Sequence, residues 1–187
     1  MKGGSQMSEQ KLVLEAKAGN KASLEQLLIL HSDQLYRTAY VYVGNREDAL
    51  DVVQETAYRA ILSIKKLRNE QYFLTWLTRI LIHCAYDLLK KKKREIPIEK
   101  MIEQTLDKRE GNIELLDLVE ALNKLKEHYR TSIILFYFQD QPIREIAKIM
   151  DIPENTVKTY LRRGKDQLKK MLGGVEYDEK TIFPRRV

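Results

Sequence analysis

The chain has 187 residues, a length that allows one or two small domains, each large enough to bury a core. With only 8 Gly and 4 Pro against many Leu, Ile, Lys and Glu, the composition favours helices, and the net charge of +6 indicates an anionic partner without identifying it. No segment approaches the roughly 18 apolar residues that span a bilayer, and the single cysteine excludes an internal disulfide bond. We therefore expect a cytoplasmic protein without a signal peptide.

Four helical patterns occupy the first half of the chain. Gly-Asn pairs at residues 19–20 and 44–45 separate the first three, because Gly-Asn is a typical helix stop, and Asn45 can also cap the next helix. A polar connector, Lys65–Gln71, precedes the fourth. The predicted helices are Glu9–Ala18, Lys21–Val43, Arg46–Lys65 and Tyr72–Lys92.

The third of these helices carries a cluster of acidic residues. Its predicted buried stripe is Leu50, Val53, Ala57, Ile61 and Ile64. The opposite face carries Asp48, Asp51, Gln54 and Glu55. Like charges at this spacing repel by a few tenths of a kcal/mol per pair, which a partner rich in Arg or Lys would relieve. A simple solvated face fits the pattern equally well, and we expect no metal site because no His joins the carboxylates at helical spacing.

The fourth helix combines an apolar stripe with a basic and aromatic face. The stripe consists of Phe73, Trp76, Leu77, Ile80, Leu81, Cys84 and Leu88, and we assign Trp76 to the core. The opposite face consists of Thr75, Arg79, Ile82, His83, Tyr86 and Lys90. Such a face can follow a phosphate backbone and stack on unpaired bases. The basic run Lys90–Arg94 extends it, although such a run also suits an ordinary solvated helix end.

The second half of the chain contains a helix-turn-helix pattern at Gln141–Leu172. Pro142 suits a helix start, and Asp151-Ile152-Pro153 is expected to break that helix. The next helix has Val157, Leu161, Leu168 and Leu172 on one stripe. Its other face is basic, with Lys158, Thr159, Arg162, Arg163 and Lys169. The second helix is therefore a candidate reader of the DNA major groove, with an ordinary helical hairpin as the alternative.

Two further helices, Ile113–Lys126 and Glu127–Gln139, are predicted before this motif. The fold expected is all-α, with two small helical domains at residues 8–94 and 113–173. A flexible linker, residues 95–112, joins them, and a flexible tail occupies residues 174–187.

These segments together resemble an alternative sigma factor of bacterial RNA polymerase, of the compact extracytoplasmic-function group of the sigma-70 family. The resemblance covers about Val13 to Leu172. It rests on AGNKASLEQLLILHSDQLYRTAY, REDALDVVQETAYRAI, FLTWLTRILIHCAYDLLKKKKR and LVEALNKLKEHYRTSIILFYF, followed by the helix-turn-helix.

The resemblance implies a role for each face. Residues implied to dock on the clamp helices of the polymerase's largest subunit are Asp48, Asp51, Gln54 and Glu55. Residues implied to bind the opened −10 element are Arg68, Asn69, Phe73, Arg79, His83, Tyr86 and Lys90, with Leu67–Phe73 as the loop that receives a flipped base. Residues implied to bind the −35 duplex are Asn155, Lys158, Thr159, Tyr160, Arg162 and Arg163.

The implied partners are core RNA polymerase, through its clamp helices and flap, promoter DNA, and an anti-sigma factor that in many members is tethered to a membrane. No small-molecule substrate is implied. Four positions depart from the family pattern. His83 replaces an Asn, Lys126 replaces a Pro and is expected to lengthen a helix, and Tyr160 and Gly164 stand where Arg and Ala are common. Gly164 lies near the apolar stripe, where it permits close packing.

No nucleophile–base pair, phosphate-binding Gly loop or pair of catalytic acids is present, so we expect neither an enzyme nor a cofactor. Two other classes stay open from the residues. One is a free-standing helix-turn-helix repressor or activator, and the other is an interaction protein whose amphipathic faces bind other helices.

Overall fold

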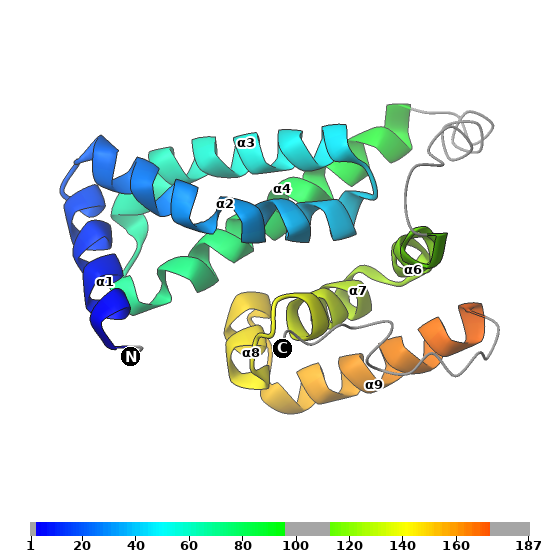
Figure 1. Ribbon diagram of the computed structural model, residues 1–187. Helices are drawn as coiled ribbons and strands as arrows, with labels where there is room; N and C mark the ends of the chain where they lie inside the picture. The colour runs from blue at the N-terminus through cyan, green and yellow to red at the C-terminus, as the bar shows by residue number, and fades with distance from the viewer. Residues whose placement is uncertain (1–2, 96–112, 173–187) are drawn as a thin grey trace.

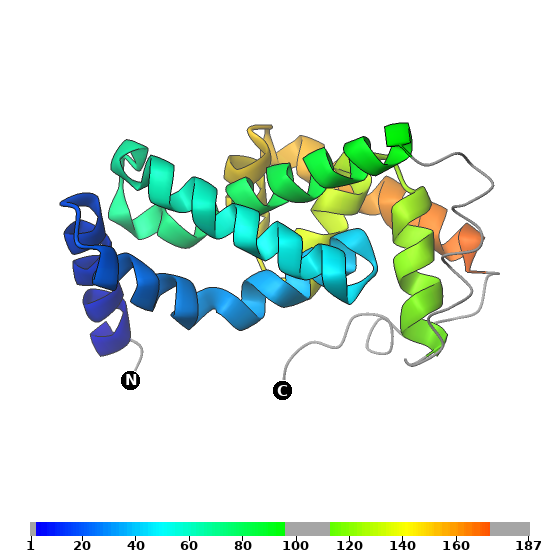
Figure 2. The same ribbon diagram turned by 90° about the horizontal axis from the view of Figure 1, so that it is seen from above.

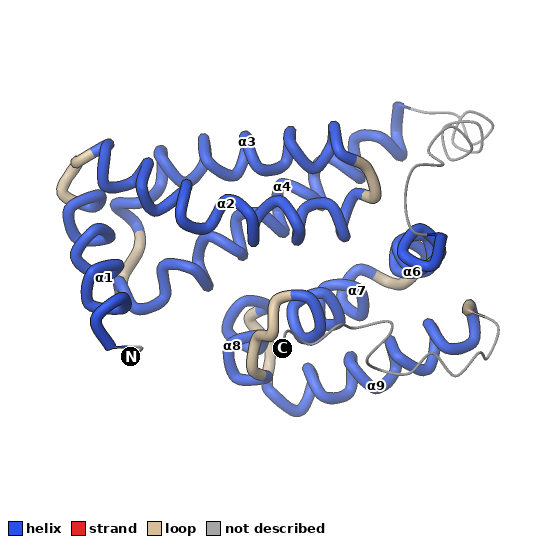
Figure 3. Tube along the Cα trace, viewed as in Figure 1, coloured by secondary structure: helices blue, strands red, loops and turns tan. Residues whose placement is uncertain are grey.

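The computed structural model describes residues 3–95 and 113–172, and all regular structure in these ranges is helical (Figure 3). The predicted all-α class is confirmed. The predicted linker beyond Glu95 and the predicted tail lie outside the described residues. Among the described helices, none has the length and apolar character needed to cross a membrane.

The N-terminal half consists of helices α1 (Gly3–Lys17), α2 (Lys21–Val43), α3 (Arg46–Ser63) and α4 (Phe73–Glu95). Helices α2, α3 and α4 pack lengthwise, and α1 lies across one end of them (Figure 1). The predicted breaks at residues 19–20 and 44–45 are confirmed, and Gly44 ends α2 with φ of 80°. Asn20 also caps α2, which the sequence analysis did not predict, by accepting hydrogen bonds from the backbone N–H groups of Ala22 and Ser23.

The register of α3 differs from the predicted one. The side chains that face α2 and α4 are Ala49, Val52, Thr56 and Ala60, each at most 1% exposed. By contrast Leu50 and Ile61, predicted as core residues, are 43% and 54% exposed. The prediction favoured the larger apolar side chains. The structure instead buries the stripe of small ones, which lets the helix axes approach closely.

The connector before α4 is more ordered than predicted. It contains two short 3-10 turns, Ile64–Lys66 and Glu70–Tyr72. Asn69 caps the second turn by accepting a hydrogen bond from the backbone N–H of Gln71 at 2.9 Å. An ion pair between Lys17 and Glu70 ties this turn to α1. The loop that the family resemblance assigns to a flipped base is therefore held in place from two sides.

The C-terminal half consists of α6 (Ile113–Lys124), α7 (Glu127–Ile133), a π-helical segment (Ile134–Phe138), α8 (Ile143–Met150) and α9 (Glu154–Met171). Lys126, which stands where the family has a proline, was expected to lengthen a helix, but it does not. It is the N-cap of α7, with φ of −61° and ψ of 142°. That φ is the value a proline ring imposes, so Lys126 keeps the backbone geometry of the residue it replaces.

The helix-turn-helix is confirmed, and its turn is made by Asp151, whose φ of 56° lies in the left-handed region. Val157, Leu161, Gly164 and Leu168 are the buried residues of α9. A Cβ at Gly164 would lie 2.7 Å from Cδ1 of Ile133 and 3.3 Å from Cβ of Tyr129. The close packing predicted at Gly164 is therefore present, between α9 and α7.

The two halves contact each other. Helix α8 packs against α4, while α6 and the π-helical segment pack against α2 (Figure 2). These contacts join the half that carries the predicted −10 residues to the half that carries the predicted −35 residues.

Candidate nucleic-acid and polymerase interfaces

The outer face of α9 presents the basic side chains predicted for the −35 duplex. Asn155, Lys158, Arg162 and Arg163 are exposed, and the apolar stripe of the same helix is buried. Arg162 lies 3.8 Å from the carboxylate of Asp166, but both side chains are more than 60% exposed, so this pair holds Arg162 only weakly. The guanidinium groups are thus available to an anionic partner.

Thr159 and Tyr160 are less available than predicted. The hydroxyl of Thr159 donates a hydrogen bond to the backbone oxygen of Asn155 at 3.0 Å. The ring of Tyr160 packs against His128 and Tyr129, with centroids 4.5 and 5.6 Å apart. Tyr160 therefore contributes to the packing of α9 on α7, a contact that no local sequence pattern signals.

The predicted −10 residues divide into accessible and inaccessible groups. Arg68, Asn69, His83 and Lys90 are exposed, and Tyr86 is half-buried with the Lys90 ammonium 5.9 Å from its ring. They extend from the connector along one side of α4.

Phe73 and Arg79 differ from this group. Phe73 is 1% exposed, and its ring centroid lies 5.8 Å from that of Trp76, so its core assignment is confirmed. The described chain therefore does not present the Phe73 ring at the surface where the −10 contact was predicted. Arg79 donates hydrogen bonds to the backbone oxygens of Lys148 and Ile149, the latter at 2.9 Å. These carbonyls lie at the C-terminal end of α8, where a cation is favoured by the helix dipole.

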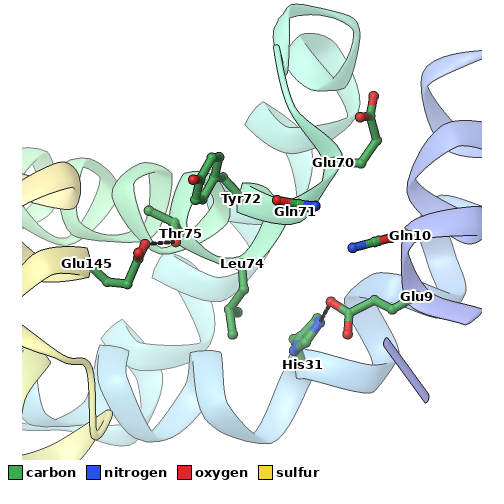
Figure 4. A pocket seen from close by; sticks show the side chains of 9 residues that line it. All are labelled: Glu9, Gln10, His31, Glu70, Gln71, Tyr72, Leu74, Thr75 and Glu145. Carbon is green, nitrogen blue, oxygen red and sulfur yellow. Dashed lines mark hydrogen bonds and ion pairs between the residues drawn. The ribbon is translucent and has the colours of Figure 1, made fainter. Parts of the chain in front are cut away.

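A pocket of about 540 Å³ lies beside the connector (Figure 4). Its lining comes from α1, α2, the connector, the start of α4 and α8. On one side Glu9 contacts Nε2 of His31 at 3.0 Å, and on another Thr75 donates a hydrogen bond to Glu145 at 3.3 Å. A hydrogen bond from Lys17 holds the pKa of Glu70 below its usual range. The lining residues are Glu9, Gln10, His31, Glu70, Gln71, Tyr72, Leu74, Thr75 and Glu145.

Of the predicted polymerase-docking residues, Asp51, Gln54 and Glu55 are exposed on α3 but Asp48 is not. Asp48 is 6% exposed. Its carboxylate bonds to the side-chain amide of Asn45 and lies 2.7 Å from Nζ of Lys92, while its backbone N–H donates to Asn45. The placement of Asp48 on the exposed acidic face is therefore wrong. The Asn-x-x-Asp spacing is the signal that indicates this reciprocal cap.

The sequence-based prediction missed apolar side chains beside the acidic ones on α3. Leu50, Tyr58, Ile61 and Leu62 are between 43% and 65% exposed. Steps of three or four residues place these apolar side chains on the same side of α3 as Gln54 and Glu55. The exposed face of α3 is therefore a mixture of apolar, polar and acidic side chains. Glu55 also bonds Arg59 at 2.7 Å, and Arg59 bonds Asp87 of α4 at 3.0 Å. The repeat at residues 50, 54, 58 and 61 is the pattern that indicates this face.

Within residues 3–95 and 113–172, no group of three or more His, Cys, Asp or Glu side chains is placed to hold a metal ion. Cys84 is buried, and burial raises the pKa of its thiol.

Comparison with known proteins agrees with this division into two halves. Residues 27–95 match the model of sigma-70 region 2, and residues 115–168 match that of sigma-70 region 4. The chain is 38% identical over 151 residues to the RNA polymerase sigma factor SigV of Bacillus subtilis, covering 80% of this chain and 91% of that protein. It is also 28% identical to the ECF RNA polymerase sigma factor SigW of the same organism, covering 89% and 98%.

Solved structures show the same fold. CnrH, solved in complex with the cytosolic domain of CnrY, is similar with a TM-score of 0.71 and 23% identity, covering 90% of this chain and 99% of that one. The sigma factor RpoE of Bartonella quintana, solved with the anti-sigma factor NepR, has a TM-score of 0.64 and 24% identity, covering 81% and 97%. From the region 2 and region 4 matches and the likeness to SigV, the chain belongs to the extracytoplasmic-function group of sigma-70 family factors, the alternative sigma factors that direct promoter-specific transcription initiation.

Proposed function

We propose that the two halves of the chain divide the promoter between them. Helix α9 binds the −35 duplex, and α4 with its preceding connector binds the −10 element as opened DNA. The observation that carries this proposal is the outward basic face of α9 on a helix-turn-helix whose apolar stripe is buried. The domains that carry out these tasks are residues 8–94 and 113–173.

The −35 contact follows from the geometry of α9. A recognition helix enters the major groove by its N-terminal part, where side chains reach base edges and phosphates. Asn155 and Lys158 lie in the first two turns of α9, and Arg162 and Arg163 lie one turn further on. We assign Lys158, Arg162 and Arg163 to phosphates or guanine edges. Tyr160 has the supporting role of fixing the helix on α7.

The proposed −10 contact requires groups that bind unpaired bases, and no covalent bond has to be broken. Arg68 and Asn69 on the connector and His83, Tyr86 and Lys90 on α4 supply cations, donors and an aromatic ring. Stacking on such a ring contributes about 1–3 kcal/mol per base. The pocket beside the connector lies next to the loop proposed to receive a flipped base. No catalytic role is proposed for any residue.

The polymerase contact is assigned to the exposed face of α3. Asp51 and Glu55 suit a basic partner surface, and Leu50, Tyr58 and Ile61 add apolar area that is exposed in the chain alone. A mixed face of this kind fits a docking surface, because apolar groups contribute affinity while charges select the partner. Asp48 has a structural role instead.

Two of the similar structures contain a bound anti-sigma factor or the cytosolic domain of CnrY. We propose that this chain is also held by an anti-sigma factor until it is released to core polymerase, and that it acts in the cytoplasm, where polymerase and promoter DNA are found.

The test is transcription with purified components. Transcription starts mapped after overexpression supply the template, which is then transcribed by core polymerase with and without the purified chain. The expected result is a product that depends on both proteins. Arg162→Ala and Arg163→Ala should reduce that product at least tenfold, since each good base contact contributes about 1–3 kcal/mol. Lys124→Ala, which removes an exposed charge from α6, is the matched control. Unchanged transcription by both Arg variants would refute the −35 assignment.

A further inference from the structure

The last residue of α1, Lys17, is bonded to the connector that the proposed function assigns to an unpaired base of the −10 element. We propose that Lys17 is a positioning residue for −10 recognition, which acts through Glu70 to hold the exposed side chains of Arg68 and Asn69 where they meet that base. Helix α1 thus affects the base preference without contacting the base. The inference rests on the proposed −10 role of the connector.

The connector has little regular structure of its own. Its two 3-10 turns are three residues long each. They are closed by backbone hydrogen bonds from Leu67 to Ile64 and from Tyr72 to Asn69, both at 3.1 Å. Turns of this kind are short and have poorer hydrogen-bond geometry than an α-helix. The position of the side chains between them, Arg68 among them, therefore depends on contacts with the surrounding helices.

Buried ends and an ion pair fix the connector to the N-terminal half. Leu67 and Phe73, which stand at its two ends, are 6% and 1% exposed. Between them, the carboxylate of Glu70 accepts a hydrogen bond from the ammonium of Lys17. Glu70 directly follows Asn69 in the chain. The ion pair therefore holds the exposed part of the connector, whereas the buried residues hold its ends.

Helix α1 is a firm support for this ion pair. Val13 and Ala16 are buried, so the helix is packed on the rest of the N-terminal half up to its last turn. In the same turn, Glu15 accepts a 2.6 Å hydrogen bond from the hydroxyl of Ser23 on α2. These contacts and the ion pair of Lys17 lie within the N-terminal half. The support therefore does not depend on where the C-terminal half is placed.

The ion pair is suited to positioning rather than to stabilising the fold. The side chains of Lys17 and Glu70 are 23% and 25% exposed, and a pair this exposed contributes little to the free energy of unfolding. The hydrogen bond from Lys17 holds the pKa of Glu70 below its usual range, so the carboxylate is charged at neutral pH. Without the pair, the connector is expected to shift while the helices stay folded. Because a hydrogen bond needs its two heavy atoms about 2.7–3.2 Å apart, a small shift weakens base selection.

The decisive experiment measures base preference in the complete polymerase. Core polymerase with each variant transcribes the mapped promoter and templates in which every −10 base is replaced in turn. We expect Lys17→Ala and Glu70→Ala to lower the preference about threefold or more at the same position, a part of the discrimination that one good base contact supplies. That position should be the one that Arg68→Ala affects. The position that His83→Ala affects should keep its preference.

The opposite charges of the two residues separate positioning from a direct phosphate contact. If Lys17 neutralised a phosphate, Lys17→Ala would weaken transcription from all templates alike and reduce its salt dependence. Glu70→Ala, which removes a negative charge, would then strengthen DNA binding. Loss of preference in both variants is expected only if the pair acts as a unit. The double variant should therefore be no worse than either single one, and the charge exchange Lys17→Glu with Glu70→Lys should restore most of the preference.

Lys11→Ala and Glu25→Ala are the matched controls, because they remove exposed charges of the same signs from α1 and α2. Neither should change the preference at any −10 position. Polymerase affinity and binding of the −35 duplex should be unchanged in all of these variants.

Hydrogen exchange in the free chain gives a measurement that does not involve DNA. The backbone N–H of Gln71 donates to Asn69, so its exchange reports on the order of the connector. Lys17→Ala and Glu70→Ala should make this exchange faster. Exchange at Leu77, which is buried on α4, should stay as slow as in the unmodified chain.

Each outcome has one meaning. If Lys17→Ala and Glu70→Ala change transcription in opposite directions, or by one factor on all templates, the positioning role is wrong. If Arg68→Ala and His83→Ala leave the preference unchanged at every position, the proposed −10 surface itself is wrong. If those two variants lose preference while the Lys17 and Glu70 variants keep it, the surface is right and the positioning role is overturned.

Discussion

The hydroxyl of Tyr42 donates a 2.8 Å hydrogen bond to Oγ1 of Thr131, joining α2 to α7 across 89 residues of sequence. Burial raises the pKa of this hydroxyl above its usual range, so the folded chain keeps it protonated and able to donate. The Arg130 guanidinium lies 5.4 Å from the Tyr42 ring and bonds the side chain of Asn123 at 3.0 Å. At this point the two halves are joined by a buried hydrogen bond between neutral hydroxyls and by a cation–ring contact.

Tyr42→Phe should loosen the two halves without unfolding either. The ring stays but the bond to Thr131 is lost, at a cost of about 0.5–1.5 kcal/mol. Hydrogen exchange should then become faster in α8 and along the Tyr72–Arg79 segment of α4. Tyr58→Phe changes an exposed tyrosine and should change nothing. A double-mutant cycle with Thr131→Val should show coupling, and strict additivity would contradict a direct bond.

Asp48→Ala should lower the stability of the N-terminal helices and leave polymerase affinity unchanged. The variant leaves Lys92 and the Asn45 amide without their carboxylate, at a cost of about 1–3 kcal/mol in the free energy of unfolding. Urea unfolding measures the first effect, and a binding titration with core polymerase measures the second.

Asp51→Lys should give the reverse result, because this carboxylate is exposed. Polymerase affinity should fall while the free energy of unfolding changes by less than about 0.5 kcal/mol, as is usual for exposed charges. If Asp48→Ala lowered polymerase affinity in a fully folded chain, the division between these two residues would be wrong.

Gly164→Val should destabilise the helix-turn-helix. The added side chain meets Ile133 and Tyr129 on α7, and overpacking of this kind costs about 1–3 kcal/mol. Chemical denaturation of the full chain measures the change. Adding Ile133→Val removes the closest atom, Cδ1, and should recover part of the loss. If the two substitutions were simply additive, the clash would not be the cause.

Cys84 should be protected from alkylation in the folded chain. It is 3% exposed, and burial raises the pKa of its thiol, which lowers the thiolate fraction at pH 8. A raised folded-state pKa stabilises the chain below the unfolded thiol's pKa of about 8.5 and loses that contribution as pH rises through the folded value. Iodoacetamide labelling, followed by mass spectrometry, should be at least tenfold slower in buffer than in urea. Equal rates would show that the α3–α4 packing opens readily.

Membership in the sigma-70 family decides between the classes that composition left open. Residues 27–95 match region 2 and residues 115–168 match region 4. Neither a free-standing repressor nor a helix-binding protein needs these two regions together. The segments that carry the resemblance are local patterns, and local patterns are what sequence reasoning reads well.

The sequence by itself determined most helices, the Asn45 cap and the helix-turn-helix, because these depend on neighbours within about four residues, but not the start of α1 at Gly3 or the π-helical segment after Ile133. Asn45 accepts a bond from the N–H group three residues away, and Pro153 with Asp151 sets the turn between α8 and α9. Spacing also showed which side chains of α9 share a face.

Only the tertiary structure decided which stripe of α3 is buried, that Asp48 turns inward and that the Phe73 ring is buried. It also placed Arg79 on the end of α8, a contact between residues about 70 positions apart in the chain. Periodicity defines the faces of a helix but not which face meets a partner, since that depends on the shape of helices distant in sequence. The contact between Arg79 and the end of α8 is for this reason a property of the assembled chain.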